Sequence, residues 1–376
     1  FNTPREMDRF ELYPMWTPFG HYTNTDKADR LLGFGVPVSL AIALGLATEA
    51  FIKMMVLGTL LMAGLSSYLV SFWIGRRKFP RTSERAVCVA AFTVSVIYML
   101  SPWSMNRIEH FFLWTGYALA PLILVGAMKG LEDHDVKTLA LTGFLWTVAS
   151  TSAHYTIFLF MLVLGALIYQ NPLRARWPQR IGLLRSFLIL LTTFLVTSMY
   201  WIAPYIASLL EGVSGPPAVL TVEVVNMLSA SSGPLNAFRG IGYWWPRTDM
   251  ALQGELGVAW GVASYIVPVM AFSALLFRRD RLTLSLTAMA LIFFVLSMGT
   301  NWGLGGAYSW LTFDAPLSRQ IGWLLRDPDK WAGPMWLTYC LLIMVTLLEL
   351  NSRSRLKFGG WSDGRNKTAA MFLTCI

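Results

Sequence analysis

Charged residues are scarce in this chain of 376 residues: Asp, Glu, Lys and Arg make up 14% of it, whereas hydrophobic residues make up 55%. Soluble domains carry about a quarter charged residues, so the composition excludes a soluble globular protein. Several apolar runs exceed the roughly 18 low-charge residues that are needed to cross the hydrocarbon core of a bilayer. The composition therefore predicts an all-α, polytopic integral membrane protein.

Cysteine is also scarce. The three cysteines, Cys88, Cys340 and Cys375, are scattered and show neither the spacing of a metal site nor a disulfide framework. The net charge is +9, but no basic stripe with interleaved aromatic residues occurs, which argues against a nucleic-acid partner. Cysteine chemistry and nucleic-acid binding are thus both disfavoured.

The distribution of Lys and Arg predicts which loops share a side of the membrane. The apolar runs lie at 31–48, 53–75, 86–101, 111–128, 138–152, 155–169, 186–210, 257–277, 282–299 and 335–350. One set of loops, 76–85, 129–137, 171–185, 278–281 and 351–376, holds 19 basic and 6 acidic residues, whereas the other set, 1–30, 102–110, 211–256 and 300–331, holds 10 and 13. Because basic residues favour cytoplasmic loops, the first set is expected inside and the second outside.

This alternation predicts about nine transmembrane helices. It requires that 31–48, which is broken by glycine and proline, form an interfacial or re-entrant helix instead of a span. We therefore expect an extracytoplasmic first loop at 1–30, a multi-spanning domain at 31–350 and a cytoplasmic tail at 351–376. The expected location is the plasma membrane, with a site that faces the extracytoplasmic side.

The densest charge cluster of the outer loops is RDPDKW at 326–331. Pro328 disfavours helical geometry at Asp327, and Asp329 could cap the last span. In one interpretation, the motif is therefore a helix start whose charges neutralise each other. In the other explanation, Arg326 and Lys330 neutralise an anionic head group. Asp327 and Asp329 then orient the two cations.

A second motif, NRIEH at 106–110, combines Arg107, Glu109 and His110. It offers phosphate binding together with general acid or base capacity, with Glu109 as an orienting group; the alternative is an interfacial Arg107–Glu109 pair. Arg239 is a further candidate for binding a phosphate. His154 is either a hydrogen-bonded histidine at a helix end or a catalytic group.

The first loop supplies the candidate catalytic acids Asp8 and Glu11, of which one would activate an acceptor hydroxyl. Asp26 and Asp29 could instead hold a hard divalent cation, the only cofactor that the sequence indicates. Acidic residues in a solvated loop are the alternative for both pairs. The aromatic residues at the predicted interfaces fit an aromatic belt, and some could stack on a sugar ring: Trp16, Trp103, Trp114, Tyr243, Trp244 and Trp245.

The order of several motifs resembles the GT-C superfamily of membrane glycosyltransferases, in particular its YfhO-like and arabinofuranosyltransferase-like members from bacteria and archaea. The resemblance rests on FNTPRE, LYPMWTPFG, KMMVLGTLLMAGLSSYLV, SPWSMNRIEHFFLWTGYALAPL and LLRDPDKW, and it covers nearly the whole chain. The sequence begins at Phe1, and no signal peptide precedes its first loop, so we expect a fragment that lacks the first transmembrane helix.

The resemblance implies an inverting enzyme that takes a sugar from a polyprenyl-phosphate donor and transfers it to an extracytoplasmic glycan, lipid or protein. It also implies a catalytic acid in the first outer loop, for which Asp8 and Glu11 stand here. Arg107, His110, Arg326 and Lys330 match recurrent polar positions of the family.

Two other classes of protein remain open. One is a transporter of lipid-linked glycan or polymer, which generally has polar or broken helices near the bilayer midplane and often has related halves. The other is a non-catalytic membrane scaffold. The strong charges of this chain lie at the predicted outer edge and no internal repeat is evident, so the sequence favours the enzyme.

Overall fold

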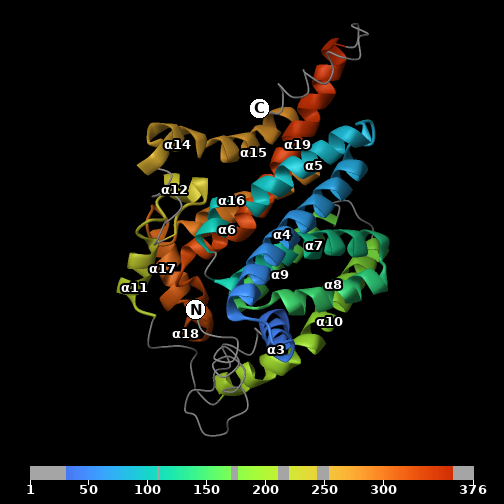
Figure 1. Ribbon diagram of the computed structural model, residues 1–376. Helices are drawn as coiled ribbons and strands as arrows, with labels where there is room; N and C mark the ends of the chain where they lie inside the picture. The colour runs from blue at the N-terminus through green and yellow to red at the C-terminus, as the bar shows by residue number, and fades with distance from the viewer. Residues whose placement is uncertain (1–30, 108–109, 171–176, 211–219, 244–253, 359–376) are drawn as a thin grey trace.

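The computed structural model describes residues 31–107, 110–170, 177–210, 220–243 and 254–358, and this part of the chain is helical without strands (Figure 1). The principal helices are α4 (Thr48–Lys78), α5 (Glu84–Met99), α7 (Phe111–Asp133), α8 (Val136–Ala149), α9 (Ala153–Gln170), α10 (Trp177–Leu210), α14 (Val258–Ala263), α15 (Ile266–Phe277), α16 (Arg281–Ser297) and α19 (Ala332–Phe358). Long apolar helices satisfy their own backbone hydrogen bonds, as a bilayer requires.

Seven segments of the described residues are long and apolar enough to cross a membrane. They are Glu49–Lys78, Glu84–Asn106, Leu113–Asp133, Ala153–Gln170, Trp177–Ala207, Val258–Phe277 and Pro328–Arg353. Two further predicted spans correspond to the shorter helices α8, with 14 residues, and α16, with 17. The all-helical architecture is thus confirmed, and its long apolar helices are compatible with a polytopic membrane protein. The number nine stays a prediction.

Helix α19 is the centre of the bundle. The apolar part of the segment Pro328–Arg353 is completely buried inside the protein, as expected for a helix that is apolar on all sides. It packs against α4, α5, α7, α15 and α16. Figure 1 shows α7, α8, α9 and α10 on one side of this centre, and α14 and α15 on the other. The segment that precedes α19 is therefore fixed by the core.

Helices α7, α8 and α9 pack closely toward the predicted outer end of the bundle. A Cβ atom at Gly116 of α7 would lie 2.3 Å from the Tyr155 ring of α9 and 2.8 Å from the Ala149 carbonyl oxygen at the end of α8. A side chain at this position would force these three helices apart. The missing side chain thus lets Tyr155 pack directly on α7.

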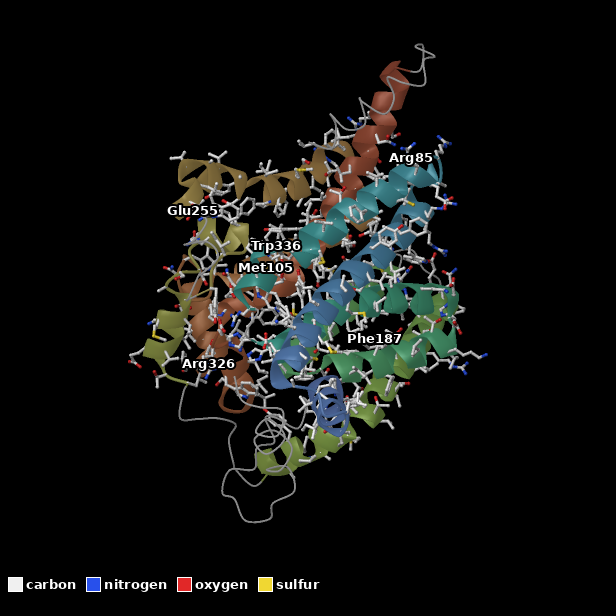
Figure 2. All side chains as sticks on the ribbon, in the orientation of Figure 1. Arg85, Met105, Phe187, Glu255, Arg326 and Trp336 are labelled. Carbon is white, nitrogen blue, oxygen red and sulfur yellow. The ribbon has the colours of Figure 1, made fainter. Side chains whose placement is uncertain are left out.

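The contacts group the loops into two sets, one at each end of the bundle. At one end Arg77 pairs with Glu132 at 2.6 Å, and Arg278 pairs with Glu349 at 3.3 Å. At the other end Arg107 contacts the segment before α19. Figure 2 shows Arg85 and Arg326 at opposite ends of the protein. For the described residues, these contacts agree with the basic and the acidic sets of loops, whereas the side of the membrane that each set faces stays a prediction.

The segment 31–48 is short and broken. It consists of a π-helical turn η2 (Leu31–Gly35), α3 (Val36–Ala43) and a turn before α4. Its 13 helical residues would extend about 20 Å, less than the roughly 30 Å of a bilayer core. This length is compatible with the interfacial or re-entrant helix that the sequence predicts.

Two features of the loops were not predicted from the sequence. Helix α10 begins at Trp177, so the end of the expected loop 171–185 is helical; Pro178 is favourable in a first turn, and the polar residues that follow it are good helix formers. The outer loops also contain short helices: α6 (Pro102–Asn106), α11 (Val222–Ser229), α12 (Pro234–Arg239), α17 (Gly305–Phe313), α18 (Ser318–Ile321), and the 3₁₀ helices η4 (Gly322–Leu325) and η5 (Pro328–Trp331).

We predict that the end carrying Gly303 faces outward and the end carrying Pro80 faces the cytoplasm. Both positions are exposed, and a Cβ atom at Gly303 would meet no other atom within 4 Å. In a cysteine-free background, Gly303→Cys should react with a membrane-impermeant maleimide in intact cells, whereas Pro80→Cys should react only after permeabilisation. The reverse pattern would contradict the orientation.

Candidate functional site

Arg107 bridges two carboxylates in the protein interior. Its Nη2 lies 3.0 Å from Oδ2 of Asp327 and 2.9 Å from Oδ2 of Asp329, and its Nε donates to the same Asp329 oxygen at 3.3 Å. The exposed fractions of the three side chains are 2%, 8% and 2%. Charge-assisted bonds are roughly twice as strong as neutral ones, so this contact ties the end of α6 to the segment before α19.

The local sequence explains how each partner reaches this position. Ser101 caps α6, its Oγ accepting from the Ser104 N–H at 3.2 Å, and Pro102 begins the helix, so Arg107 falls at the helix end. Asp327 is extended, with φ −117° and ψ 93°, as expected for a residue that precedes proline. The expected departure of Asp327 from helical geometry is confirmed.

The alternative that Asp329 caps the last span is wrong. Its carboxylate accepts from Arg107, and the 3₁₀ helix η5 begins one residue earlier, at Pro328, with Asp327 as the N-cap residue and no side-chain cap bond. A buried guanidinium is a stronger partner for a carboxylate than the backbone N–H groups of a short helix. Asp329 therefore serves a tertiary contact.

Two aromatic side chains complete the surroundings of this ion pair. The guanidinium carbon of Arg107 lies 4.0 Å from the centre of the Tyr243 ring, within the range of a cation–π contact. The indole Nε1 of Trp103 donates to the Asp329 carbonyl oxygen at 3.1 Å. These two residues, predicted as part of an aromatic belt, are both almost completely buried.

Lys330 joins the same cluster from the other side of Asp327. Its Nζ lies 3.9 Å from Asp327 Oδ2 and 3.3 Å from Nε2 of His154. His154 Nδ1 in turn lies 3.0 Å from the Oγ of Ser152. Because an ammonium group only donates hydrogen bonds, this arrangement fits a neutral His154 that accepts through Nε2 and donates from Nδ1.

The charges of Arg107, Asp327, Asp329 and Lys330, here called the ion cluster, sum to zero when all four are ionised. Burial opposes ionisation of Asp327, but Arg107 and Lys330 outweigh it, so the pKa of Asp327 lies below its usual value. Burial likewise disfavours the Arg107 cation, but Asp327 and Asp329 outweigh it and raise the pKa of Arg107. The neighbouring charges thus keep this arginine and aspartate ionised in spite of their burial.

Arg326 adds a cation beside this balanced cluster. Its side chain is half-buried and makes no hydrogen bond or ion pair with any residue that the structure describes. Its charge nevertheless acts on Asp327, whose pKa it helps to lower. Figure 2 shows Arg326 toward the end of the protein that carries α17 and α18. Of the two cations in RDPDKW, Arg326 is the one better placed to accept a new partner.

Lys330, predicted to neutralise an anionic head group together with Arg326, is buried. It is only 8% exposed and is engaged by Asp327 and His154. The reason is that Lys330 lies at the start of the segment that enters the core of the bundle, so its side chain is enclosed by neighbouring helices. Its role toward a phosphate stays a prediction.

The remaining candidates fall into three groups. His110 is the residue before α7, and its ring meets the Tyr243 ring edge-on, with the ring centres 6.4 Å apart. Arg239 makes its contacts with a different set of residues, Ser264 and Asn236. The other predicted residues lie outside the described part of the chain: Asp8, Glu11, Asp26, Asp29 and Glu109. Within the described part, no three His, Cys, Asp or Glu side chains are grouped to hold a metal ion.

His154 is the participant that the sequence underestimated. The sequence leaves it as a hydrogen-bonded histidine at a helix end or a catalytic group. The structure shows a hydrogen bond to Ser152 and a contact with Lys330, 176 residues away. The available signal was its location, because 150–154 is a polar turn at the same predicted end as RDPDKW. A local pattern could not show which cation it meets.

We predict that Arg107→Ala strongly destabilises the protein. Removal of one partner from a buried ion pair costs about 3–5 kcal/mol, because the remaining charges stay buried without compensation. Unfolding free energies in detergent would measure this loss. Arg77→Ala is the matched control, because Arg77 and Glu132 form an ion pair whose side chains are 42% and 29% exposed, and such a pair contributes about 0–1 kcal/mol. Equal losses for the two variants would contradict a special role of the ion cluster.

Comparisons of the chain with protein-family models, with curated proteins and with solved structures found no match. The resemblance to GT-C glycosyltransferases therefore stays a prediction from the order of the motifs. The features that bear on function are the ion cluster, Arg326 beside it and the apolar helical architecture.

Proposed function

We propose that this protein is a membrane glycosyltransferase that transfers a sugar from a polyprenyl-phosphate donor to an extracytoplasmic glycan, lipid or protein. The observation that carries the proposal is the charge-balanced ion cluster with one further cation, Arg326, at its side. The four charges of the cluster neutralise each other, so Arg326 adds a positive charge that no described residue pairs with. An excess cation next to a span suits an anionic lipid head group.

The contribution of the ion cluster is preorganisation. Arg107 holds both carboxylates of RDPDKW, and those carboxylates fix the backbone from which Arg326 and Lys330 extend. A group that is already held in place costs no reorganisation when charge develops in the transition state. The cluster would thus hold the backbone of Arg326 and Lys330 in place throughout the reaction.

Arg326 is assigned to the donor phosphate. As the bond between the sugar and the phosphate breaks, negative charge grows on the phosphate oxygens, and a guanidinium can bind two of them at once. Lys330, held between Asp327 and His154, would add a second positive charge to the same region. Asp8 or Glu11 is assigned as the base that removes the proton of the acceptor hydroxyl.

The transporter is the second candidate, and one observation favours it. Asp329 and Lys330 lie inside the candidate span Pro328–Arg353, and ionisable residues within spans often mark transport paths. However, both occupy the first turn of that segment, and Asp329 is neutralised by Arg107. A fixed and neutral cluster at a helix end suits a binding site better than a path through the bilayer.

We predict that Arg326→Ala lowers donor affinity or turnover on the order of 10- to 150-fold, because a charge-assisted bond to phosphate contributes about 1.5–3 kcal/mol. Arg326→Lys should restore part of this loss, since the charge remains but the two-pronged contact is lost. Transfer from a panel of polyprenyl-phosphate pentoses and hexoses, measured with full-length protein in membranes, would test it. Arg279→Ala, at an exposed arginine of the other end, is the control.

The unfolding free energy of Arg326→Ala should stay close to that of the wild type, because Arg326 makes no ion pair with a described residue. Unchanged transfer in this variant would contradict the phosphate assignment. If full-length protein moves a lipid-linked sugar across vesicles without forming a new glycosidic bond, it is a transporter. If it does neither, the scaffold alternative holds.

A further inference from the structure

An open apolar groove lies between α12, α15 and α16. Its volume is about 500 Å³, and it is lined by Phe238, Val269, Phe272, Ser273, Leu276 and Leu291. Val269, Phe272 and Leu276 recur every three or four residues, so they form one face of α15. This set of six residues is here called the groove.

The groove presents hydrocarbon to its surroundings. Val269, Leu276 and Leu291 are 58%, 74% and 46% exposed, as expected for side chains that face lipid. Ser273 does not interrupt this surface, because its hydroxyl donates to the Met270 carbonyl oxygen at 2.7 Å. The groove therefore suits a flexible apolar chain.

A buried cation directly follows Phe238, the α12 residue of the groove. Arg239, which directly follows Phe238, is 8% exposed, and its guanidinium donates to Ser264 Oγ at 3.0 Å and to Asn236 Oδ1 at 2.5 Å. Its guanidinium carbon also lies 5.2 Å from the centre of the Tyr265 ring. All of these partners are neutral.

The contrast with Arg107 is informative. Arg107 has two carboxylate partners, whereas no carboxylate of the described residues forms an ion pair with Arg239. A buried charge without a counterion is costly. An anion bound at this position would supply the charge that the described side chains do not.

The geometry points to a bound anionic phospholipid, with one acyl chain in the groove and its phosphate on Arg239. If a methylene group takes up about the 30 Å³ of a water molecule, a volume of about 500 Å³ holds on the order of 17 of them, which is one acyl chain. A polyprenyl chain is several times longer. The groove therefore fits a bilayer phospholipid better than the sugar donor, to which the sequence assigned Arg239.

This lipid site goes beyond the proposed function and is physically connected to the candidate site. Tyr243, four residues after Arg239, stacks on Arg107. The segment from Arg239 to Tyr243 extends at most about 14 Å. A phosphate bound to Arg239 would therefore restrain this short segment, whose last residue contacts Arg107 of the ion cluster. The bound lipid would thus help to keep Tyr243 in place beside the ion cluster without contacting the cluster itself.

Native mass spectrometry of the full-length protein tests the proposal without any assay of sugar transfer. The protein would be released from nanodiscs of phosphatidylcholine that contain a minority of phosphatidylglycerol, and the retained lipids would be counted. We expect wild type to retain phosphatidylglycerol in excess of its share. Arg239→Gln should reduce this retention by about 10-fold or more, as loss of a charge-assisted bond implies.

Two further variants control this result. Val269→Trp should block the acyl chain, and it folds because position 269 faces lipid. Arg279→Gln removes an exposed cation just beyond the opposite end of α15 and should retain phosphatidylglycerol like the wild type. Equal retention in Arg239→Gln and wild type would overturn the proposal, as would displacement of phosphatidylglycerol by polyprenyl phosphate in equal amounts.

Discussion

The guanidinium of Arg107, held between two buried carboxylates, is the contact on which the candidate site depends. Taking these charges out of water is costly, and only their mutual attraction and hydrogen bonds offset the cost. The contact joins residues that are 220 and 222 positions apart. It therefore fixes the short helix α6 against the start of α19, the most deeply buried helix of the bundle.

The two buried arginines of this end show how charge balance separates two roles. Arg107 is fully compensated by carboxylates, so its part is to hold RDPDKW in place. Arg239 has only neutral described partners and directly follows Phe238 of an apolar groove, so it is suited to bind an anion from outside the protein. Arg326, half-buried beside the balanced cluster, resembles Arg239 in this respect. Cations without a carboxylate partner among the described residues are the best candidates for binding phosphate.

The sequence predicted the fold class and the grouping of loops, because both follow from average properties of long segments, namely hydropathy and the distribution of Lys and Arg. It also predicted the extended backbone of Asp327, which depends only on Pro328. The pairing of Arg107 with Asp327 and Asp329 could not be predicted, since no local pattern shows which of several outer charges meet in the fold. The local sequence allows Asp329 to cap a helix, because it does not show that Arg107 is the partner of this carboxylate. The first-loop residues Asp8 and Glu11 lie outside the described part of the chain, so their role stays a prediction.

A double-mutant cycle between Arg107 and Asp329 tests the central claim most directly. The unfolding free energies of Arg107→Met, Asp329→Leu and the double variant would be compared with that of the wild type. If the buried ion pair holds the site together, the double variant should lose less than the sum of the single losses, with a coupling energy of about 2–3 kcal/mol. Losses that add within about 0.5 kcal/mol would show that the two residues act independently, and would contradict the account.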